Sequence, residues 1–496
     1  MIKVSNEAKS ELSNIINSRK LNPDQCIRLS VPPAWKGEGD FGLVISNYGV
    51  SDNIIEFNNK KILLIDADLT NQLSKSNLDF KDGRFTLDIY WNKNTCKYFN
   101  RGNYLKDIII IGAGPAGNIV AEKTAEAGLD VLVLDWRQII GDKLCTGIIG
   151  KECLDKFPPR EEDIYHKVKS ATLISPNNKT YRITRSNTQA AILNRVSYIQ
   201  SFANKAKKYG AKYDLEHRVT EIKQNTDHIS IKAKYKEVLK TYKCKLLIIS
   251  SGFNTPLLRM VGIETNNKSL MGSQIEVEVE KPLETQVYFG KEISPGSFGW
   301  LVPLSKSRAL LGVISKEKTQ ENIKYFLNKL INEGKILDLN YNIKSWGIPI
   351  SPINKTYKNR ILITGDAAGL TKPTTGGGIY YSLLSGQLAA KTSIAAIKSN
   401  NLSENKLKEY QSAWKNIFGK EISISHYSRL FFETLNDEQI EKIISLGFEF
   451  QKELINESDF SFDWHSKVIL KAFKIKKMRE SLIKLVPIIP SILLKK

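Results

Sequence analysis

Three glycines have the spacing that holds a phosphate-bearing dinucleotide: Gly112, Gly114 and Gly117, in the pattern G-x-G-x-x-G. The first permits a tight turn, the second lets a pyrophosphate approach the backbone, and the third lets a helix pack close to the preceding strand. Asp135 follows about 20 residues later, where a carboxylate can accept hydrogen bonds from a ribose hydroxyl. These four residues predict a dinucleotide-binding site.

Two strands and a helix must position these residues. Asp107 to Ile111 is an isoleucine-rich run that predicts a buried strand, and Val131 to Leu134 predicts a second one. Between them, Pro115 to Ala127 predicts a helix whose free N–H groups would face the phosphates. Such glycine spacing also occurs by chance, but the complete order of strand, glycines, helix, strand and acid favours the dinucleotide.

Composition indicates a globular protein with an anionic partner. The chain has 496 residues, of which 41% are hydrophobic and 25% charged, so we expect roughly two to four domains. Its 73 lysines and arginines exceed its 52 acids, and the net charge of +21 favours contact with phosphates, nucleic acid or acidic lipid. The alternative is an ordinary solvated surface. Among these partners we expect anionic lipid and no nucleic acid.

The cysteines indicate neither a metal centre nor disulfides. All five are widely scattered, without the C-x-x-C pair of a metal site or a redox disulfide. We therefore expect no metal and reduced thiols in the cytoplasm. The first ten residues lack the features of a signal peptide, and no apolar run approaches the roughly 18 residues of a membrane span.

Residues 1–100 predict a small α+β domain, which begins with a helical stretch from Ser5. Four strands are predicted, at Ile27 to Val31, Phe41 to Ile45, Lys61 to Ile65 and Arg84 to Ile89. This order resembles the A-type iron-sulfur carrier family, which has the HesB-like fold. The family has one ligating cysteine after the second strand and a C-x-C pair near the end.

The cysteines of the carrier family are missing here. The corresponding stretches read PPAWKGEGDFGL and DIYWNKNTCKYF, so that only Cys96 remains. One thiolate is not a cluster site, because a cluster needs about four protein ligands. We therefore expect a docking or dimerisation domain that binds no cluster.

From Leu105 the chain resembles the geranylgeranyl reductase family, within the wider group of aromatic hydroxylase-like FAD enzymes. A second signature, RILITGDAAGLTKPTTGGG, carries this resemblance. It implies that a strand ends at Gly365 and that Asp366 accepts hydrogen bonds from the ribityl hydroxyls of a flavin. Three glycines then open a helix whose amides can face a pyrophosphate or the flavin N1–C2=O edge: Gly376, Gly377 and Gly378. A tight connection without a ligand is the alternative, but two such helix starts around one sheet favour FAD.

Two further positions bear on the cofactor. Arg195, in the pair Asn194-Arg195, stands where the family has an Asp-Arg pair before a helix, which implies a contact with the phosphates or the flavin. A helix cap followed by a surface arginine is the alternative. Ser251 replaces the aspartate of an alanine-aspartate-glycine signature in hydroxylase relatives, and this difference weakens a monooxygenase interpretation.

The candidate catalytic residues come from the same resemblance. PGSFGWLVP, from Pro295 to Pro303, resembles the P-x-x-Y-x-W-x-F-P motif of the reductases, with Phe298 in place of tyrosine. Phe298 and Trp300 would share one side of a strand and line an apolar tunnel beside the flavin, unless they are ordinary core. Cys145 stands where reductase relatives carry a cysteine near the flavin ring. Its thiol could donate a proton to the substrate, or it could be a small buried hydrophobe.

The expected fold class is α/β. A Rossmann-like FAD domain of the aromatic hydroxylase type, residues 101–400, would be interleaved with an antiparallel β substrate domain at about residues 165–190 and 265–350, and a helical region would follow at 401–496. The resemblance implies reduction of C=C bonds in a geranylgeranyl chain, with electrons from NAD(P)H or a ferredoxin-like protein. The alternatives are an FAD-dependent monooxygenase or halogenase, and a flavin-bearing scaffold that recruits an iron-sulfur partner.

The C-terminal segment is basic and amphipathic. From Lys467 to Lys496 it holds nine lysines and arginines, interleaved with apolar residues, against the single acid Glu480. A helix of this kind lies in the headgroup plane of an anionic membrane, so we expect peripheral membrane association. Pro487 and Pro490 interrupt its apolar end, which is too short to span. The alternative is a helix packed on the substrate domain.

Overall fold

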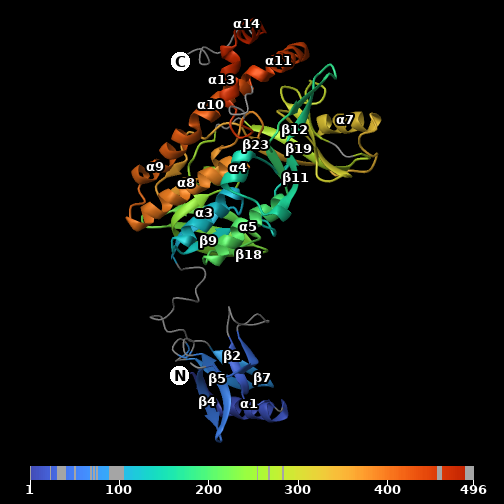
Figure 1. The fold of residues 1–496 in the computed structure, drawn as a ribbon. Coiled ribbons are helices and arrows are strands. Elements are labelled where there is room, and N and C mark those ends of the chain that lie inside the picture. The colour runs from blue at the N-terminus through green and yellow to red at the C-terminus, as the bar shows by residue number, and fades with distance from the viewer. Residues whose placement is uncertain are drawn as a thin grey trace. The chain divides into compact units, whose positions relative to one another are not determined.

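The computed structural model describes residues 2–19, 21–22, 24–30, 41–49, 52–66, 70, 73, 76–88, 105–253, 255–265, 269–281, 284–454 and 461–485. The chain forms two compact units, Met1–Tyr104 and Leu105–Lys496 (Figure 1). The helices after residue 400 belong to the second unit, in which they pack on the strands and helices that precede them.

The first unit is a small α+β fold. Its helix α1 (Asn6–Arg19) begins where Ser5 Oγ accepts a hydrogen bond from the N–H of Ala8 at 3.1 Å, and Ala8 and Leu12 are buried beneath it. Two sheets have the strand orders β3-β2-β5-β4 and β1-β6-β7. Their strands are β1 (Lys3–Val4), β2 (Gln25–Ser30), β3 (Gly42–Asn47), β4 (Asp52–Phe57), β5 (Lys60–Asp66), β6 (Asn77–Lys81) and β7 (Arg84–Asp88).

The sequence interpretation had missed strands in this unit. It predicted β2, β3, β5 and β7 with ends displaced by at most two residues, but not β1, β4 and β6. Strands β4 and β6 begin with Asp52 and Asn77, residue types that are typical of turns. They form because their partners β5 and β7 follow directly across short turns.

The second unit is organised around a largely parallel sheet. Strand β8 (Leu105–Ile111) pairs in parallel with β9 (Val131–Leu134) and with β18 (Val238–Ile249), and β18 pairs in parallel with β25 (Ile361–Ile363). The isoleucines of β8 are buried on both faces, as expected of a central parallel strand. The other members of this eight-stranded sheet are β15 (Lys212–Asp214), β16 (His217–Gln224), β17 (Ile229–Tyr235) and β24 (Tyr357–Lys358).

Helices α3 (Pro115–Glu126) and α8 (Ile379–Lys398) pack beside this sheet, and α5 (Arg195–Lys208) packs against α3. Helix α8 lies against α3 through Gly386, where a Cβ would stand 2.2 Å from Ile119 and 2.7 Å from the carbonyl oxygen of Ala116. Gly386 therefore lets α8 pack closely on α3. The parallel strands end on the side where α3 and α8 begin, and this side becomes one wall of the site.

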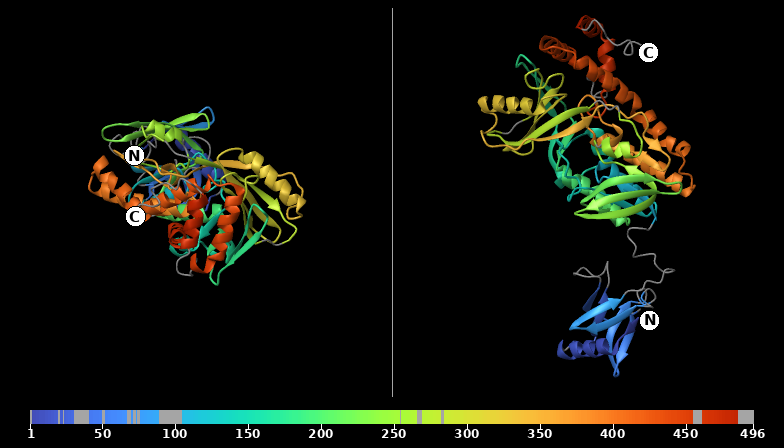
Figure 2. Two further views of the ribbon diagram at one scale, coloured as in Figure 1. Left: turned by 90° about the horizontal axis from the view of Figure 1, so that it is seen from above. Right: turned by 180° about the vertical axis from the view of Figure 1, so that it is seen from behind.

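A second sheet faces that edge, with the order β13-β12-β20-β21-β22-β19-β23. Helix α7 (Thr319–Asn332) covers its outer face, as Figures 1 and 2 show. Its strand pairs are antiparallel, as expected, except that β12 and β20 run in parallel. The strands are β12 (Ser170–Ile174), β13 (Thr180–Thr184), β19 (Ser269–Glu278), β20 (Thr285–Tyr288), β21 (Phe298–Pro303), β22 (Arg308–Ser315) and β23 (Lys344–Pro349).

A three-stranded sheet connects the two halves: β10 (Ile148–Gly150), β14 (Ala190–Leu193) and β11 (Ile164–Val168). The short elements α4 (Lys151–Lys156), η1 (Glu161–Asp163), α6 (Thr255–Met260) and η2 (Gly365–Ala368) complete this part. The C-terminal helices run along one side of the unit in Figures 1 and 2. They are α9 (Glu404–Trp414), η3 (Lys415–Gly419), α10 (Lys420–Phe432), α11 (Asp437–Glu449), α12 (Gln451–Leu454), α13 (Ser466–Lys474) and α14 (Lys476–Leu485).

Within the described part of the chain, none of the helices combines the length and apolar content needed to cross a bilayer. The residues after Leu485, which include the two prolines of the predicted tail, lie outside the described residues.

Candidate active site

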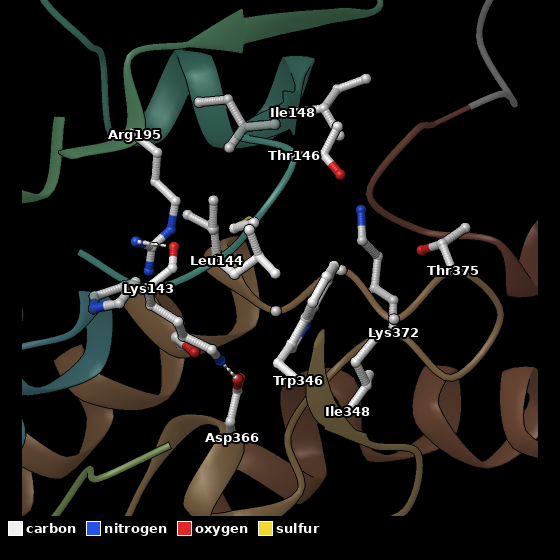
Figure 3. Close-up of a pocket in the computed structure, with 18 of the residues that line it drawn as sticks. Lys143, Leu144, Thr146, Ile148, Arg195, Trp346, Ile348, Asp366, Lys372 and Thr375 are labelled. Atoms are coloured by element: carbon white, nitrogen blue, oxygen red, sulfur yellow. Dashed lines mark hydrogen bonds and ion pairs between the residues drawn. The ribbon is translucent and has the colours of Figure 1, made fainter. Parts of the chain in front are cut away.

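A cavity of about 1560 Å³ lies between the carboxyl ends of the parallel strands and the seven-stranded sheet. The first wall holds the glycines at the starts of α3 and α8, and the second holds the aromatic side chains of β21 and β23. Figure 3 shows side chains from both walls pointing into this space. All thirteen residues predicted for the site except Gly117 line it.

The three glycines of the first signature differ in what their missing side chains allow. Gly112 has a φ of +108°, and a Cβ there would stand 2.4 Å from the carbonyl oxygen of Ser250. A Cβ on Gly117 would stand 1.9 Å from the carbonyl oxygen of Gly112, so that only glycine lets α3 approach the strand. Gly114 has extended backbone and nothing within 4 Å of its Cβ direction. Gly114 thus leaves space open in front of the first N–H groups of α3, as a pyrophosphate would require.

Asp135 joins the end of β9 to the glycine loop. Its carboxylate is 5% exposed and accepts the N–H of Ala113 at 2.7 Å and the N–H of Arg137 at 2.8 Å. Each carboxylate oxygen can accept a further hydrogen bond, so Asp135 can hold the loop and still receive a ribose hydroxyl.

Asp366 has a partner that the sequence interpretation missed. The Lys143 ammonium lies 2.5 Å from Asp366 Oδ2, and Figure 3 shows the two side chains meeting across the cavity floor. Gly378 makes room for this carboxylate, because a Cβ there would stand 2.6 Å from Asp366 Oδ1. The positive φ of Gly365, +64°, turns the chain at the end of β25. Lys143 lies only two residues before Cys145, but no local pattern relates it to Asp366.

Arg195 is buried, so the alternative of a surface arginine is wrong. Asn194 does cap α5, since its Oδ1 accepts the N–H of Ser197 at 3.2 Å. Arg195 turns inward, and its Nη1 donates to the carbonyl oxygens of Gly141 and Lys143. It therefore supports the loop of residues 141–146. Its side chain also lines the cavity, and its Nε has no hydrogen-bond partner within the described part of the chain.

Cys145 lies on that loop. It is half-buried, lines the cavity and accepts the N–H of Gly147 at its Sγ at 3.4 Å. Of the four cysteines that the structure describes, Cys145 alone lines the cavity. Cys153 is buried away from the cavity, and burial raises the pKa of its thiol well above the ordinary value. The next residue, Thr146, ties the loop to β19 through a 3.0 Å hydrogen bond to Gln274.

The opposite wall is aromatic. Phe298 and Trp300 project from β21 into the cavity, with ring centroids 6.1 Å apart. Trp346 of β23, which was not predicted, lines the same space. Each indole lies over a glycine of the neighbouring strand, because a Cβ on Gly312 would stand 2.1 Å from Trp300 and one on Gly272 would stand 2.8 Å from Trp346. The two Trp–Gly pairs let flat rings form an apolar surface without pushing the strands apart.

Several buried polar atoms of the lining have no hydrogen-bond partner among the described residues. They are Arg195 Nε, His217 Nε2, Ser251 Oγ, Thr285 Oγ1, Ser297 Oγ, Trp300 Nε1 and Ser428 Oγ. Buried polar groups are normally satisfied, so such a concentration indicates a site for a ligand with many polar atoms. A dinucleotide fits the unpaired atoms on the glycine-lined side, which are Arg195 Nε, His217 Nε2 and Ser251 Oγ, together with the open direction at Gly114. No group of metal-ligating side chains occurs among the residues that the structure describes.

Residues 106–283 match the family model described as pyridine nucleotide-disulphide oxidoreductase. The digeranylgeranylglycerophospholipid reductase of Methanocaldococcus jannaschii is 28% identical over 355 residues, which are 69% of this chain and 90% of that protein. The enzyme of the same name from Methanococcus aeolicus is 30% identical over 327 residues, 63% of this chain and 83% of the relative.

A solved structure shares the fold. A geranylgeranyl bacteriochlorophyll reductase-like protein from Thermoplasma acidophilum matches with a TM-score of 0.68 at 22% identity, covering 77% of this chain and 99% of that one. The Rossmann-type arrangement expected from the sequence is therefore confirmed.

Proposed function

This chain belongs to the digeranylgeranylglycerophospholipid reductase family, and from that premise we propose that it reduces the C=C bonds of geranylgeranyl chains carried on a glycerophospholipid. It is an FAD-dependent oxidoreductase. The observation that carries the proposal is one cavity with two kinds of wall. A polar, glycine-lined wall suits the cofactor, and the apolar wall of Phe298, Trp300 and Trp346 suits a prenyl chain.

The polar wall offers separate contacts for four parts of FAD: the pyrophosphate, a ribose, the ribityl chain and the flavin ring. The amides that follow Gly114 would bind the pyrophosphate, and Asp135 would bind the ribose. Asp366 would bind the ribityl hydroxyls, and the amino end of α8 would face the flavin ring. When bound and reduced, FAD supplies the hydride for the reaction.

The apolar wall would bind the prenyl chain, and Cys145 would provide the proton that the reaction needs besides the hydride. Phe298 and Trp300 hold the prenyl chain by dispersion contact and exclude water from the double bond. Addition of a hydride to one alkene carbon requires a proton on the other, and the Cys145 Sγ–H is the proposed donor. The proton returns to the thiol from solvent between turnovers. Electrons come from NAD(P)H or a ferredoxin-like protein.

An anaerobic assay tests this function. Protein with prereduced flavin is mixed with a geranylgeranyl glycerophospholipid, and flavin reoxidation is followed together with product mass. We expect reoxidation with a gain of two hydrogens for each double bond. Reoxidation that occurs only after O2 is admitted to a parallel sample, with an oxygenated product, would instead indicate a monooxygenase. The absence of any lipid product would contradict the proposal.

The C-terminal helices α13 and α14 are the proposed contact with anionic membranes. Helix α13 is amphipathic but has no fully buried residue, and Leu470 is 37% exposed. Lys467 and Lys474 of the same helix are also exposed, and Ile469 lines the cavity. A membrane contact here would place the bilayer beside the cavity that receives the lipid.

The first unit is proposed to be a HesB-like domain that contacts a protein partner without holding a cluster. Cys26 is buried, and burial raises the pKa of its thiol, which opposes ligation by the thiolate. Cys96 lies outside the described residues. Near-stoichiometric iron and sulfide in the anaerobically reconstituted protein would contradict this proposal.

A further inference from the structure

A buried ion pair lies within the cavity and has no place in the function above. Lys372, 6% exposed, belongs to the loop before α8, and its Nζ donates to the carbonyl oxygen of Phe462 at 3.0 Å. The same Nζ lies 3.4 Å from Oδ1 of the fully buried Asp463. Removing two charges from water costs several kcal/mol per ion, of the order of what their attraction returns. Stability alone therefore gives little reason for the pair.

The pair is located at the glycines that open α8. The N–H of Lys372 donates to the carbonyl oxygen of Gly377 at 2.9 Å, and the N–H of Gly376 donates to the carbonyl oxygen of Lys372 at 2.8 Å. The side chain folds back over this tight loop, so that a Cβ on Gly377 would stand 3.6 Å from Lys372 Nζ. Figure 3 shows Lys372 extending into the cavity beside Trp346, toward Thr146. The ammonium is thus held beside the proposed flavin-facing end of α8.

Asp463 is held in place from several sides. Its Oδ2 accepts the N–H of Cys153 at 3.2 Å, and its backbone carbonyl oxygen accepts the hydroxyl of Tyr381 at 3.3 Å. Gly150 permits the approach, since a Cβ there would stand 2.3 Å from Asp463 Oδ2. The carboxylate and the ammonium therefore remain at fixed positions relative to the glycines.

We propose that Lys372 and Asp463 set the reduction potential of the FAD bound at Gly376–Gly378, with Lys372 raising it and Asp463 lowering it. The inference rests on the proposed function for the location of the flavin. Reduction adds negative charge to the cofactor, and a cation fixed in a low-dielectric site stabilises the more negative state. The carboxylate opposes this effect. Lys372 and Asp463 do not react with the substrate. They change turnover only through the reduction potential of the flavin.

The test measures the midpoint potential of bound flavin by anaerobic titration against a reference dye. Lys372→Met should shift the potential to more negative values, whereas Lys372→Arg should keep it near that of the wild type. Asp463→Asn, which retains an acceptor for Cys153, should shift it to more positive values. Lys391→Met removes the same charge from an exposed position of α8 and should leave the potential unchanged. Flavin content and the thermal midpoint are recorded for each variant.

Opposite shifts from Lys372→Met and Asp463→Asn would support the inference. The inference would be overturned if the midpoint potential of Lys372→Met equalled that of Lys391→Met. It would also be overturned if Lys372→Met and Asp463→Asn shifted the potential in the same direction. If Lys372→Met fails to retain flavin, the midpoint potential of Asp463→Asn is compared with that of Lys372→Arg. The inference then requires a more positive potential in Asp463→Asn. Normal prenyl reduction with unchanged potentials would sink this inference alone, whereas shifted potentials in a protein that reduces no prenyl lipid would sink the proposed function alone.

Discussion

Arg195 donates through Nη1 to the carbonyl oxygen of Lys143 at 3.1 Å, so a buried cation of α5 supports the loop that carries Cys145. Arg195→Lys keeps the charge but loses the planar guanidinium group. At least one of the carbonyl oxygens of Gly141 and Lys143 should then lose its hydrogen-bond donor. Hydrogen bonds from charged groups contribute about 1.5–3 kcal/mol. We expect a lower thermal midpoint, reduced flavin content and turnover reduced about tenfold, since about 1.4 kcal/mol corresponds to a factor of ten.

Arg182→Lys is the control for this prediction, because Arg182 forms an exposed ion pair with Glu284 outside the cavity. It should change neither flavin content nor turnover. Wild-type stability and turnover in Arg195→Lys would show that the loop needs no support from this side chain.

Gly114→Val should remove flavin and keep the fold. The added methyl groups would enter open space, because nothing lies within 4 Å of the Cβ direction, but this is the space that the pyrophosphate requires. Gly447→Val is the matched control, because its Cβ direction is equally open on the remote helix α11. Flavin absorbance per protein and the far-ultraviolet circular dichroism spectrum measure the two effects. Full flavin occupancy in a folded Gly114→Val protein would contradict the site assignment.

Gly312→Ala should alter the apolar wall. A Cβ at this position would stand 2.1 Å from the Trp300 ring, so the indole must move into the cavity. Gly299→Ala crowds Phe326 in the core beneath the sheet in the same way. Overpacking costs about 1–3 kcal/mol, and both variants should be destabilised by about that amount in denaturant titrations. Only Gly312→Ala should raise the KM for a long prenyl substrate, and an equal change in KM for both would contradict the assigned wall.

His465 should make stability depend on pH. Burial and the nearby Lys372 ammonium lower its pKa from 6.5 to about 4, while the ring nitrogens contact Thr374 and the carbonyl oxygen of Phe462. The folded state therefore keeps the imidazole neutral, and the unfolded state binds a proton first as pH falls. The contribution of neutral His465 to the free energy of unfolding is complete above pH 6.5 and is lost as the pH falls from 6.5 to about 4.

Because of this histidine, the free energy of unfolding should be about 2 kcal/mol lower at pH 5 than at neutral pH. Equilibrium unfolding in guanidinium chloride at pH 7.5 and pH 5 should show a smaller loss in His465→Gln than in the wild type. His166→Gln, a change at an exposed histidine of β11, should behave like the wild type. An identical loss in all three proteins would exclude His465 as the cause.

Lys467→Glu combined with Lys474→Glu should weaken binding to anionic vesicles without loss of flavin. Each cation near the surface contributes about 1 kcal/mol, and charge reversal replaces attraction by repulsion. Lys408→Glu with Lys415→Glu has the same spacing on exposed positions of α9 and η3 and serves as the control. Sedimentation with anionic liposomes at low salt measures the difference, and high salt should reduce the binding of the wild type in part. Equal sedimentation of both double variants would mean that α13 is a packing surface.

Local chemistry determined several features that the sequence alone could predict. A Cβ on Gly117 would clash with the carbonyl oxygen of Gly112 within the same motif, and the positive φ of Gly112 makes the tight turn, so the motif alone assigns both glycines. Alternation along a strand likewise places Phe298 and Trp300 on one side of β21. The Ser5 cap of α1 also depends on contacts between residues only three positions apart.

Only the tertiary structure decided which distant residues meet. Lys143 and Asp366 are 223 positions apart, and Lys372 and Asp463 are 91 apart, so no short pattern relates the members of either pair. Trp346 enters the site because β23 pairs with β19, and Arg195 turns inward because the 141–146 loop lies beside α5. Such contacts depend on chain topology and on the desolvation of charges within a packed interior, which act between elements rather than along the chain.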